Sequence, residues 1–268
     1  MNLVYRAYKL FKNEGLISVL YGAKKKLISP LDPLYQCIKP AYRTYSVGAT
    51  DATFSMKPRR LDCHDFVDDL NSERDLIKRM LNVTKKDDIF YDVGANIGVH
   101  SCLIGNYIES GRLVAFEPIP DVFNTLEENI AQNGIKADLF NIALSNENST
   151  TRMAIEGQTG HQFSKDNGSL EIEMRRADDV VTDQNLPLPD ICKIDIEGAE
   201  YLALEGFQNT LAESPCRHVF CEIHTSKIEE VGGSAEEVES LLQRLGFNIE
   251  YMGDRRENYF IQATNLKE

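Results

Sequence analysis

The stretch Asp88-Ile-Phe-Tyr-Asp-Val-Gly-Ala-Asn-Ile-Gly98 decides the fold of this chain. An apolar run over 89–93 ends in a turn with two glycines, and a helical pattern of apolar residues begins at Ile97. A strand, a tight turn and a helix in this order open a nucleotide-binding α/β unit. Gly94 gives the turn its backbone freedom, and Gly98 lets the helix approach the strand or a ligand closely.

Asn96 is expected to cap the helix after this turn, because its side-chain oxygen is a good acceptor for a first-turn amide. The other first-turn amides and the positive end of the helix would then face an anionic group of a ligand above the strand. The turn is therefore predicted to bind a cofactor.

A second strand is predicted at 112–116, and it ends in Glu117-Pro118. Glu117 follows the glycines by about 20 residues, where a nucleoside-binding fold places an acid on the two ribose hydroxyls. Pro118 keeps Glu117 extended at the strand tip. We therefore expect Glu117 to bind the ribose of a nucleoside cofactor.

The spacing of the glycines separates two classes of enzyme. An NAD-dependent oxidoreductase would prefer Gly-x-Gly-x-x-Gly, but the corresponding positions are Gly94, Asn96 and Val99, so that fingerprint is broken. The pattern Asp-x-Gly-x-x-x-Gly followed by Glu-Pro resembles the first two motifs of a class I S-adenosylmethionine (SAM) methyltransferase. The oxidoreductase is kept as the alternative from another class, and a catalytically inactive interaction module as a third.

Length and composition set the frame for the rest of the chain. With 268 residues and 42% hydrophobic content, one α/β domain at 61–268 is expected, preceded by an extension and linker at 1–60. The net charge of −13 argues against nucleic-acid binding. Cys102, Cys192 and Cys221 fall in apolar patterns and are expected to be reduced core residues.

The N-terminus is basic and amphipathic. Residues 3–20 show helical periodicity and precede three consecutive lysines at 24–26. Two interpretations stay open: residues 1–26 contact an anionic membrane surface, or the helix packs on the domain or on a second subunit. Since neither a membrane-spanning run nor a signal peptide is visible, we expect a cytoplasmic protein, with peripheral attachment to the inner face of the membrane as an option.

Alternating strands and helices are predicted beyond this extension. Four prolines make 28–60 read as an irregular linker, and a helix is expected over 66–81. Strands are expected at 137–144, 150–155, 169–175, 191–194, 218–223, 247–251 and 259–263, and helices at 121–133, 199–207 and 235–245. This order predicts a doubly wound, mostly parallel sheet closed by an antiparallel pair. The loop 157–164 carries His161, a candidate to cover the substrate.

A second acidic cluster follows the strand at 191–194, in the stretch Asp195-Ile-Glu-Gly-Ala-Glu200. Ligands of doubly wound sheets bind beyond the carboxyl ends of the strands, so Asp195, Glu197, Glu117 and Asn96 are expected to gather there. Asp195 is a candidate catalytic residue. Glu200 is interpreted as an ordinary first-turn acid that complements the helix dipole.

The next strand ends in Glu222-Ile-His224. Strand alternation puts Glu222 and His224 on the same side, next to Asp195. His224 is a candidate general base for a hydroxyl nucleophile, with a solvated loop residue as the structural alternative. Asp195, Glu222 and His224 also offer a divalent-metal set, but no metal is predicted.

Five motifs together resemble the FkbM family of SAM-dependent methyltransferases. They are Asp92-Val-Gly-Ala-Asn-Ile-Gly98, Phe116-Glu-Pro118, Asn141-Ile-Ala-Leu-Ser145, Lys193-Ile-Asp-Ile-Glu-Gly-Ala-Glu200 and Glu222-Ile-His224. The match runs in the family's order over about 65–263. It implies a class I, Rossmann-like methyltransferase fold, with a doubly wound, mostly parallel seven-stranded sheet behind a helical N-terminal extension.

The resemblance also implies an activity and a set of roles. The enzyme would transfer a methyl group from SAM to a hydroxyl of a sugar, glycan or glycolipid precursor, with a soluble small-molecule natural product as the alternative acceptor. The turn with Asp92, Gly94, Asn96 and Gly98 would hold the methionine end of SAM, Glu117 the ribose, and Asn141 and Ala143 the adenine. Asp195 or His224 would act as base or orient the acceptor, and Glu197 and His161 would contact it.

Overall fold

A computed structural model describes residues 42–55, 70, 73–156, 160–163, 170–255 and 258–265. The helix expected over 3–20, the lysines at 24–26 and the start of the helix expected at 66 lie outside the described residues. Both interpretations of the N-terminus therefore stay predictions. None of the helices in the described ranges is long and apolar enough to cross a membrane.

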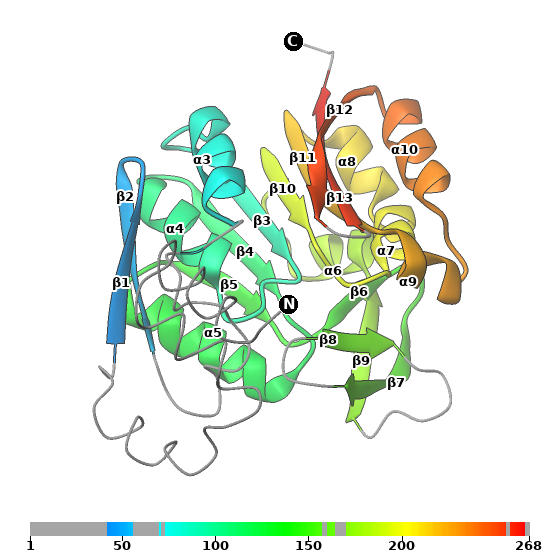
Figure 1. Ribbon diagram of the computed structural model, residues 1–268, viewed down its shortest axis with the longest axis horizontal. Coiled ribbons are helices and arrows are strands. Elements are labelled where there is room, and N and C mark those ends of the chain that lie inside the picture. The colour runs from blue at the N-terminus through cyan, green and yellow to red at the C-terminus, as the bar shows by residue number, and fades with distance from the viewer. Residues whose placement is uncertain are drawn as a thin grey trace, which may run out of the picture.

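Seven strands form the main sheet, in the order β12-β13-β11-β10-β3-β4-β5. The five strands from β11 to β5 run parallel, whereas β13 pairs antiparallel with both β11 and β12. This is the doubly wound, mostly parallel, Rossmann-like sheet that was predicted (Figure 1). The strands are β3 (Ile89–Val93), β4 (Arg112–Phe116), β5 (Ala137–Phe140), β10 (Ile191–Ile194), β11 (His218–His224), β12 (Phe247–Arg255) and β13 (Asn258–Asn265).

Helices cover both faces of the main sheet (Figure 1). Successive residues of a strand point to opposite faces, so Phe90 and Tyr91 of β3 belong to two different hydrophobic clusters. One cluster includes α3 (Glu73–Val83), α4 (Val99–Tyr107) and α5 (Pro120–Gln132). The other includes α6 (Ala177–Asp183), α7 (Glu200–Gly206), α8 (Gln208–Glu213), α9 (Thr225–Glu230) and α10 (Ala235–Arg244).

A smaller sheet of four strands, in the order β6-β9-β7-β8, is drawn below the main sheet in Figure 1. Its strands are β6 (Ala143–Ser145), β7 (Ser149–Glu156), β8 (Gly160–Phe163) and β9 (Leu170–Arg176). The prediction of one strand over 137–144 is wrong, because the chain leaves β5 at Phe140 and enters this second sheet at Ala143. The polar stretch that was expected to be only a loop contains β8, which pairs antiparallel with β7.

The interpretation of residues 28–60 as an irregular linker is wrong over 42–55. These residues form the antiparallel hairpin of β1 (Tyr42–Val47) and β2 (Thr50–Ser55). Tyr45, Val47 and Phe54 are buried in the cluster that includes α3, α4 and α5. Fully burying such a side chain stabilises a fold by roughly 1.5–3 kcal/mol. The hairpin therefore packs with the domain that follows it, while the division of the chain at residue 60 stays a prediction.

The other strands and helices predicted within the described residues are confirmed with shifted ends, and α6, α8 and α9 are additions. Gly134 ends α5 with a φ of 67°, as a glycine after a helix does. Cys102, Cys192 and Cys221 are free and buried, which confirms their prediction as reduced core residues.

Candidate active site

The turn between β3 and α4 contains three left-handed residues: Gly94, Asn96 and Gly98, with φ of 78°, 52° and 90°. The prediction of Asn96 as the helix cap is wrong. Gly98 takes the cap position without a side-chain hydrogen bond, and Asn96 Oδ1 accepts from the backbone N–H of Ile97 at 2.8 Å. The first amides of α4 therefore have no side-chain cap, so they are available to a ligand above the strand.

Glycine is required at two positions of this turn by close approach. A Cβ on Gly94 would lie 2.0 Å from the backbone oxygen of Asp195, and one on Gly98 would lie 2.7 Å from Cδ1 of Leu126. The turn after β3 therefore touches the turn after β10 directly. This contact holds the two halves of the expected site together.

Glu117 is buried beside the same turn. Its two carboxylate oxygens accept hydrogen bonds from the backbone N–H groups of Asn96 at 3.0 Å and Ile119 at 2.9 Å. Burial raises the pKa of Glu117 to about 7, against the opposing effect of these two amides. A carboxylate has about four lone-pair positions, so two are left for the hydroxyls of a ribose.

Asp92 and Lys193 join the two halves of the site below the surface. They are register partners on β3 and β10, and Asp92 Oδ1 lies 3.3 Å from Lys193 Nζ. Lys193 also donates to the backbone oxygen of Gly94 at 2.8 Å and lies 3.4 Å from Asp195 Oδ2. Burial opposes the charge of Lys193, but Asp92 and Asp195 raise its pKa above the ordinary value. Asp92 is fully buried and accepts from Ser101 Oγ at 2.6 Å, so it fixes the turn from beneath.

The residues expected around the adenine and the acceptor occupy different environments. Asn141 donates from Nδ2 to the backbone oxygen of Glu117 at 2.8 Å, which places it beside the expected ribose site. Ala143 is buried in β6, in the hydrophobic cluster that includes α4 and α5. His161 lies on β8, where it pairs with Ile155. The roles of these three residues stay predictions.

At the carboxyl ends of β10 and β11, four carboxylates surround one imidazole. His224 Nδ1 lies 2.7 Å from Glu200 Oε1, and His224 Nε2 lies 3.4 Å from Glu197 Oε2. Asp195 Oδ1 and Glu222 Oε1 each lie 3.9 Å from the same Nε2. His224 is 3% exposed and lies at the end of β11, so its interpretation as a solvated loop residue is wrong.

The charge of His224 follows from these neighbours. Burial lowers its pKa, but the hydrogen bond with Glu200 and the charges of Asp195 and Glu197 outweigh burial and raise it to about 9. In this arrangement the imidazole carries a proton on both nitrogens at neutral pH. It would have to lose one before it could act as a general base.

Glu200 is the residue that sequence reasoning underestimated. It is fully buried at the start of α7, and its Oε1 accepts from the backbone N–H of Gly198 at 2.9 Å as well as contacting His224. Glu200 does lie in the first turn of α7, as the interpretation had it, but it also contacts His224, which the interpretation did not include. Its partner lies 24 residues away, a distance over which local sequence pattern carries no signal.

Glu197 lies in the turn that connects Asp195 to α7. Glu197 and Gly198 are both left-handed, with φ of 58° and 110°, and a Cβ on Gly198 would lie 2.7 Å from Cβ of Lys227. Lys227 forms an ion pair with Glu197 Oε2. The Glu197 and Asp195 side chains are 35% and 25% exposed, so they are the members of the cluster that an acceptor can reach.

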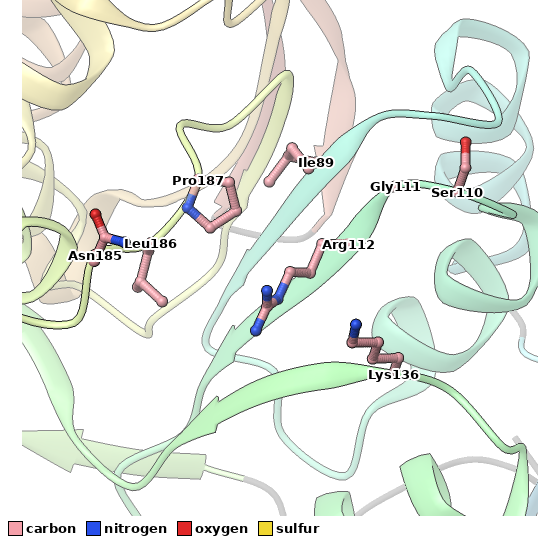
Figure 2. A pocket seen from close by; sticks show the side chains of 8 residues that line it. All are labelled: Ile89, Ser110, Gly111, Arg112, Lys136, Asn185, Leu186 and Pro187. Atoms are coloured by element: carbon pink, nitrogen blue, oxygen red, sulfur yellow. The ribbon is translucent and has the colours of Figure 1, made fainter.

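A pocket of about 500 Å³ lies at the opposite end of the sheet. Figure 2 shows Ile89 and Arg112, at the starts of β3 and β4, and Lys136, just before β5, around it. Arg112 forms an ion pair with Asp138. Because ligands of doubly wound sheets bind at the carboxyl ends of the strands, we assign this pocket no part in the chemistry.

The fold and the site together define a class. The strand order, a glycine turn, a buried strand-tip glutamate and acidic residues beyond the next strands are the architecture of a class I methyltransferase, whose methyl donor is SAM. Residues 92–249 match the family described as Methyltransferase FkbM domain. The chain therefore belongs to the FkbM methyltransferase family and is a methyltransferase.

Individual relatives agree with this assignment. The hexuronic acid methyltransferase AglP of Haloferax volcanii is 30% identical over 196 residues, which cover 72% of this chain and 77% of AglP. The 31-O-demethyl-FK506 methyltransferase FkbM of Streptomyces tacrolimicus is 26% identical, with 60% and 73% covered. A chain of the fibrillarin/Nop5p complex is similar in fold, with a TM-score of 0.50 at 14% identity over 83% of this chain and 97% of that one.

Proposed function

We propose that this methyltransferase transfers the methyl group of SAM to a hydroxyl oxygen of a sugar, glycan or glycolipid precursor. The observation that carries the proposal is the placement of Asp195 and His224 across a single turn-to-turn contact from the Gly94 turn and Glu117. The similarity to AglP, which is named for a hexuronic acid substrate, supports a sugar acceptor. Such an acceptor offers hydroxyls that carboxylates can orient by hydrogen bonds.

The residues of the Gly94 turn fit SAM. In the proposed arrangement Glu117 accepts from the ribose, Asn141 and Ala143 line the adenine side, and Asn96 and Gly98 shape the binding of the methionine end. Asp92 is proposed to contribute to SAM binding indirectly, by fixing the Gly94 turn. The bound cofactor supplies a methyl group on a sulfonium, which is a good leaving group, so holding the acceptor oxygen in line provides much of the acceleration.

On the acceptor side, Asp195 and His224 are the proposed base or orienting residues. Glu197, partly exposed beside Asp195, and His161 on β8 are proposed to contact the substrate. General-base help of this kind contributes roughly 10²–10⁴-fold to a rate.

Transfer of labelled methyl from SAM into defined acceptors tests the proposal. We expect label in an oxygen-methylated uronic acid or glycan, and about 10²–10⁴-fold slower labelling with the Asp195→Asn variant. The alternative is a soluble small-molecule natural product, favoured by the similarity to the FK506 methyltransferase. Label that enters only a non-sugar hydroxyl would select that alternative. Label in neither class would overturn the proposal.

We also propose that the enzyme is cytoplasmic and that residues 1–26 contact an anionic membrane, which suits a lipid-linked acceptor. The eight basic side chains among residues 1–45, against two acidic ones, support this surface contact. Co-sedimentation with anionic vesicles tests it, using the full chain and a chain without residues 1–40, which keeps the buried hairpin. Equal, negligible binding of both forms would contradict the contact.

A further inference from the structure

Asp195, Glu222 and His224 form a cluster, and the proposed transfer reaction gives no role to Glu222. One ligand-type atom from each residue lies within 4.8 Å of the other two. We infer that these three side chains bind a divalent cation of the Mn²⁺ type, which in turn binds the acceptor hydroxyl. The cation's role in catalysis rests on the proposed function, whereas the binding of the cation does not.

The spacing of the three groups suits ligands of one ion better than direct partners of each other. His224 Nε2 lies 3.9 Å from Asp195 Oδ1 and 3.9 Å from Glu222 Oε1, which is too long for a hydrogen bond. Two ligand atoms about 2.1 Å from a common ion at tetrahedral or octahedral angles are roughly 3.0–3.4 Å apart. A contraction of roughly 0.5–0.9 Å in the two distances from Nε2 would therefore bring these atoms onto an ion, together with an approach of the two carboxylate oxygens, which lie within 4.8 Å of each other.

The orientation of His224 is the second, independent observation. His224 is 3% exposed, and its Nε2 forms no hydrogen bond with any residue in the described ranges, although Glu197 Oε2 lies 3.4 Å from it. Nδ1 is held at 2.7 Å by Glu200, which is itself fixed by the backbone N–H of Gly198. A carboxylate on one ring nitrogen, with the other nitrogen directed at further carboxylates, is the arrangement that orients metal-bound histidines. Binding of the cation would displace the proton from Nε2, since a metal-bound imidazole is neutral.

The donor set points to the kind of ion. Two carboxylates favour Mg²⁺ and Mn²⁺, and an imidazole favours the transition metals, so Mn²⁺ satisfies both preferences. Three protein ligands leave positions open on an octahedral ion. Asp195 and Glu197 are partly exposed, so we expect an acceptor to reach the open positions from their side.

A cation here would change how the acceptor oxygen becomes a nucleophile. A hydroxyl bound to a divalent ion has a lowered pKa and releases its proton to water. The acceptor oxygen then forms a bond to the methyl carbon as the carbon–sulfur bond breaks. The electron pair of that bond stays on sulfur, so the products are the methyl ether, S-adenosylhomocysteine and one proton.

The test uses the full chain, freed of metal by chelation and dialysis, and titrates it with Mn²⁺ alone while free Mn²⁺ is followed by electron paramagnetic resonance. We expect one saturable site, with affinity at least about tenfold weaker in Glu222→Gln and in Glu200→Gln. Glu229→Gln is the matched control, because it removes the same charge from an exposed position on α9. Circular dichroism confirms that each variant is folded.

Two outcomes overturn the inference: no saturable site in the folded wild-type chain, or equal affinity in Glu222→Gln, Glu200→Gln and Glu229→Gln. Measuring methyl transfer with and without chelator separates the two proposals. Transfer that is unaffected by chelation leaves the proposed function standing and removes the metal's role. A Mn²⁺ site in a chain that binds no SAM would leave the metal site standing and overturn the proposed function.

Discussion

The two ends of the parallel sheet use charge in opposite ways. At the amino ends of β3, β10 and β11, one arginine forms ion pairs with two acids: Arg217 contacts Asp88 at 2.6 Å and Asp190 at 3.3 Å. Both acids also accept backbone N–H groups, from Lys85 and Ile89. At the carboxyl ends of β10 and β11, four carboxylates surround His224 at 2.7–3.9 Å.

The difference separates a structural ion-pair network from a binding site. In the amino-end network both acids are paired with Arg217 and also accept backbone N–H groups, so few of its polar groups are left to bind a ligand. The carboxyl-end cluster concentrates negative charge around one imidazole and has two partly exposed members, Asp195 and Glu197. Such an arrangement costs stability unless a ligand compensates it, so we place the chemistry there.

The largest expected effect is on catalysis at the carboxyl end. Asp195→Asn keeps the shape of the side chain but removes its charge, so methyl transfer should fall by about 10²–10⁴-fold. The dissociation constant for SAM should change little, since Asp195 is expected to face the acceptor. Single-turnover kinetics and calorimetry measure the two quantities separately. A loss of SAM binding with an unchanged rate at saturation would reverse the assignment.

At the amino end the expected effect is on stability alone. Arg217→Met leaves Asp88, which is 2% exposed, without its cation, and should lower the free energy of unfolding by roughly 3–5 kcal/mol. Urea denaturation measures this change. SAM affinity measured below the unfolding transition should be unchanged. If binding weakens in parallel, the two ends are coupled and the comparison fails.

The same substitution, glycine to alanine, can be made at each end of the parallel sheet. A Cβ on Gly94 would lie 2.0 Å from the oxygen of Asp195, and one on Gly111 would lie 1.9 Å from the oxygen of Asp88. Gly94→Ala and Gly111→Ala should each destabilise the fold by about 2–4 kcal/mol. Only Gly94→Ala should also weaken SAM binding, which calorimetry on the folded variants detects. Equal effects on binding would contradict the placement of the cofactor.

The smallest effect concerns the ionisation of Glu117, whose pKa burial raises to about 7, while Lys193 acts to lower it and Asp92 to raise it. Ribose hydroxyls donate to the ionised form, so SAM should bind roughly tenfold more tightly at pH 8 than at pH 6. Glu117→Gln should remove this dependence. Calorimetry at both pH values measures it, and a pH-independent wild-type affinity would exclude a ribose role for the carboxylate.

Glu117 also makes the stability of the fold depend on pH. This stability is expected to fall as pH rises, whereas SAM affinity is expected to rise. The folded chain holds the Glu117 proton more tightly than the unfolded chain, whose glutamate has its ordinary pKa near 4.5. The stabilisation from this group is therefore complete below the ordinary pKa, and is lost as pH rises through about 7. Urea denaturation at pH 5 and pH 8 should show this decrease in the wild type and a smaller one in Glu117→Gln.

Local pattern was sufficient for the parts of the site that lie within one strand and its turn. The run into Gly94, the acid at Glu117 and the strand tip at Asp195 could each be predicted because strand, turn and helix signals are short-range. The wrong cap assignment for Asn96 shows the limit of this reasoning. Two further left-handed residues, Gly94 and Gly98, shift the helix start to Val99.

Contacts between distant segments were beyond local pattern. The hairpin at 42–55 was missed although Gly48-Ala49 between Val47 and Thr50 is a turn signal, because the prolines around it suggested a linker. The role of Glu200 depends on His224, and that of Lys193 on Asp92, 101 positions earlier in the chain. Such pairs follow from the order of the strands in the sheet, which sequence pattern alone does not provide.

Calorimetric titration of the full chain with SAM, S-adenosylhomocysteine and NAD tests the central claim most directly, namely that the carboxyl ends of β3 and β4 bind the methyl donor. We predict saturable one-to-one binding of the first two compounds, competition between them, and no heat for NAD. A folded chain that binds neither SAM nor its demethylated product, or that binds NAD in their place, would contradict the account.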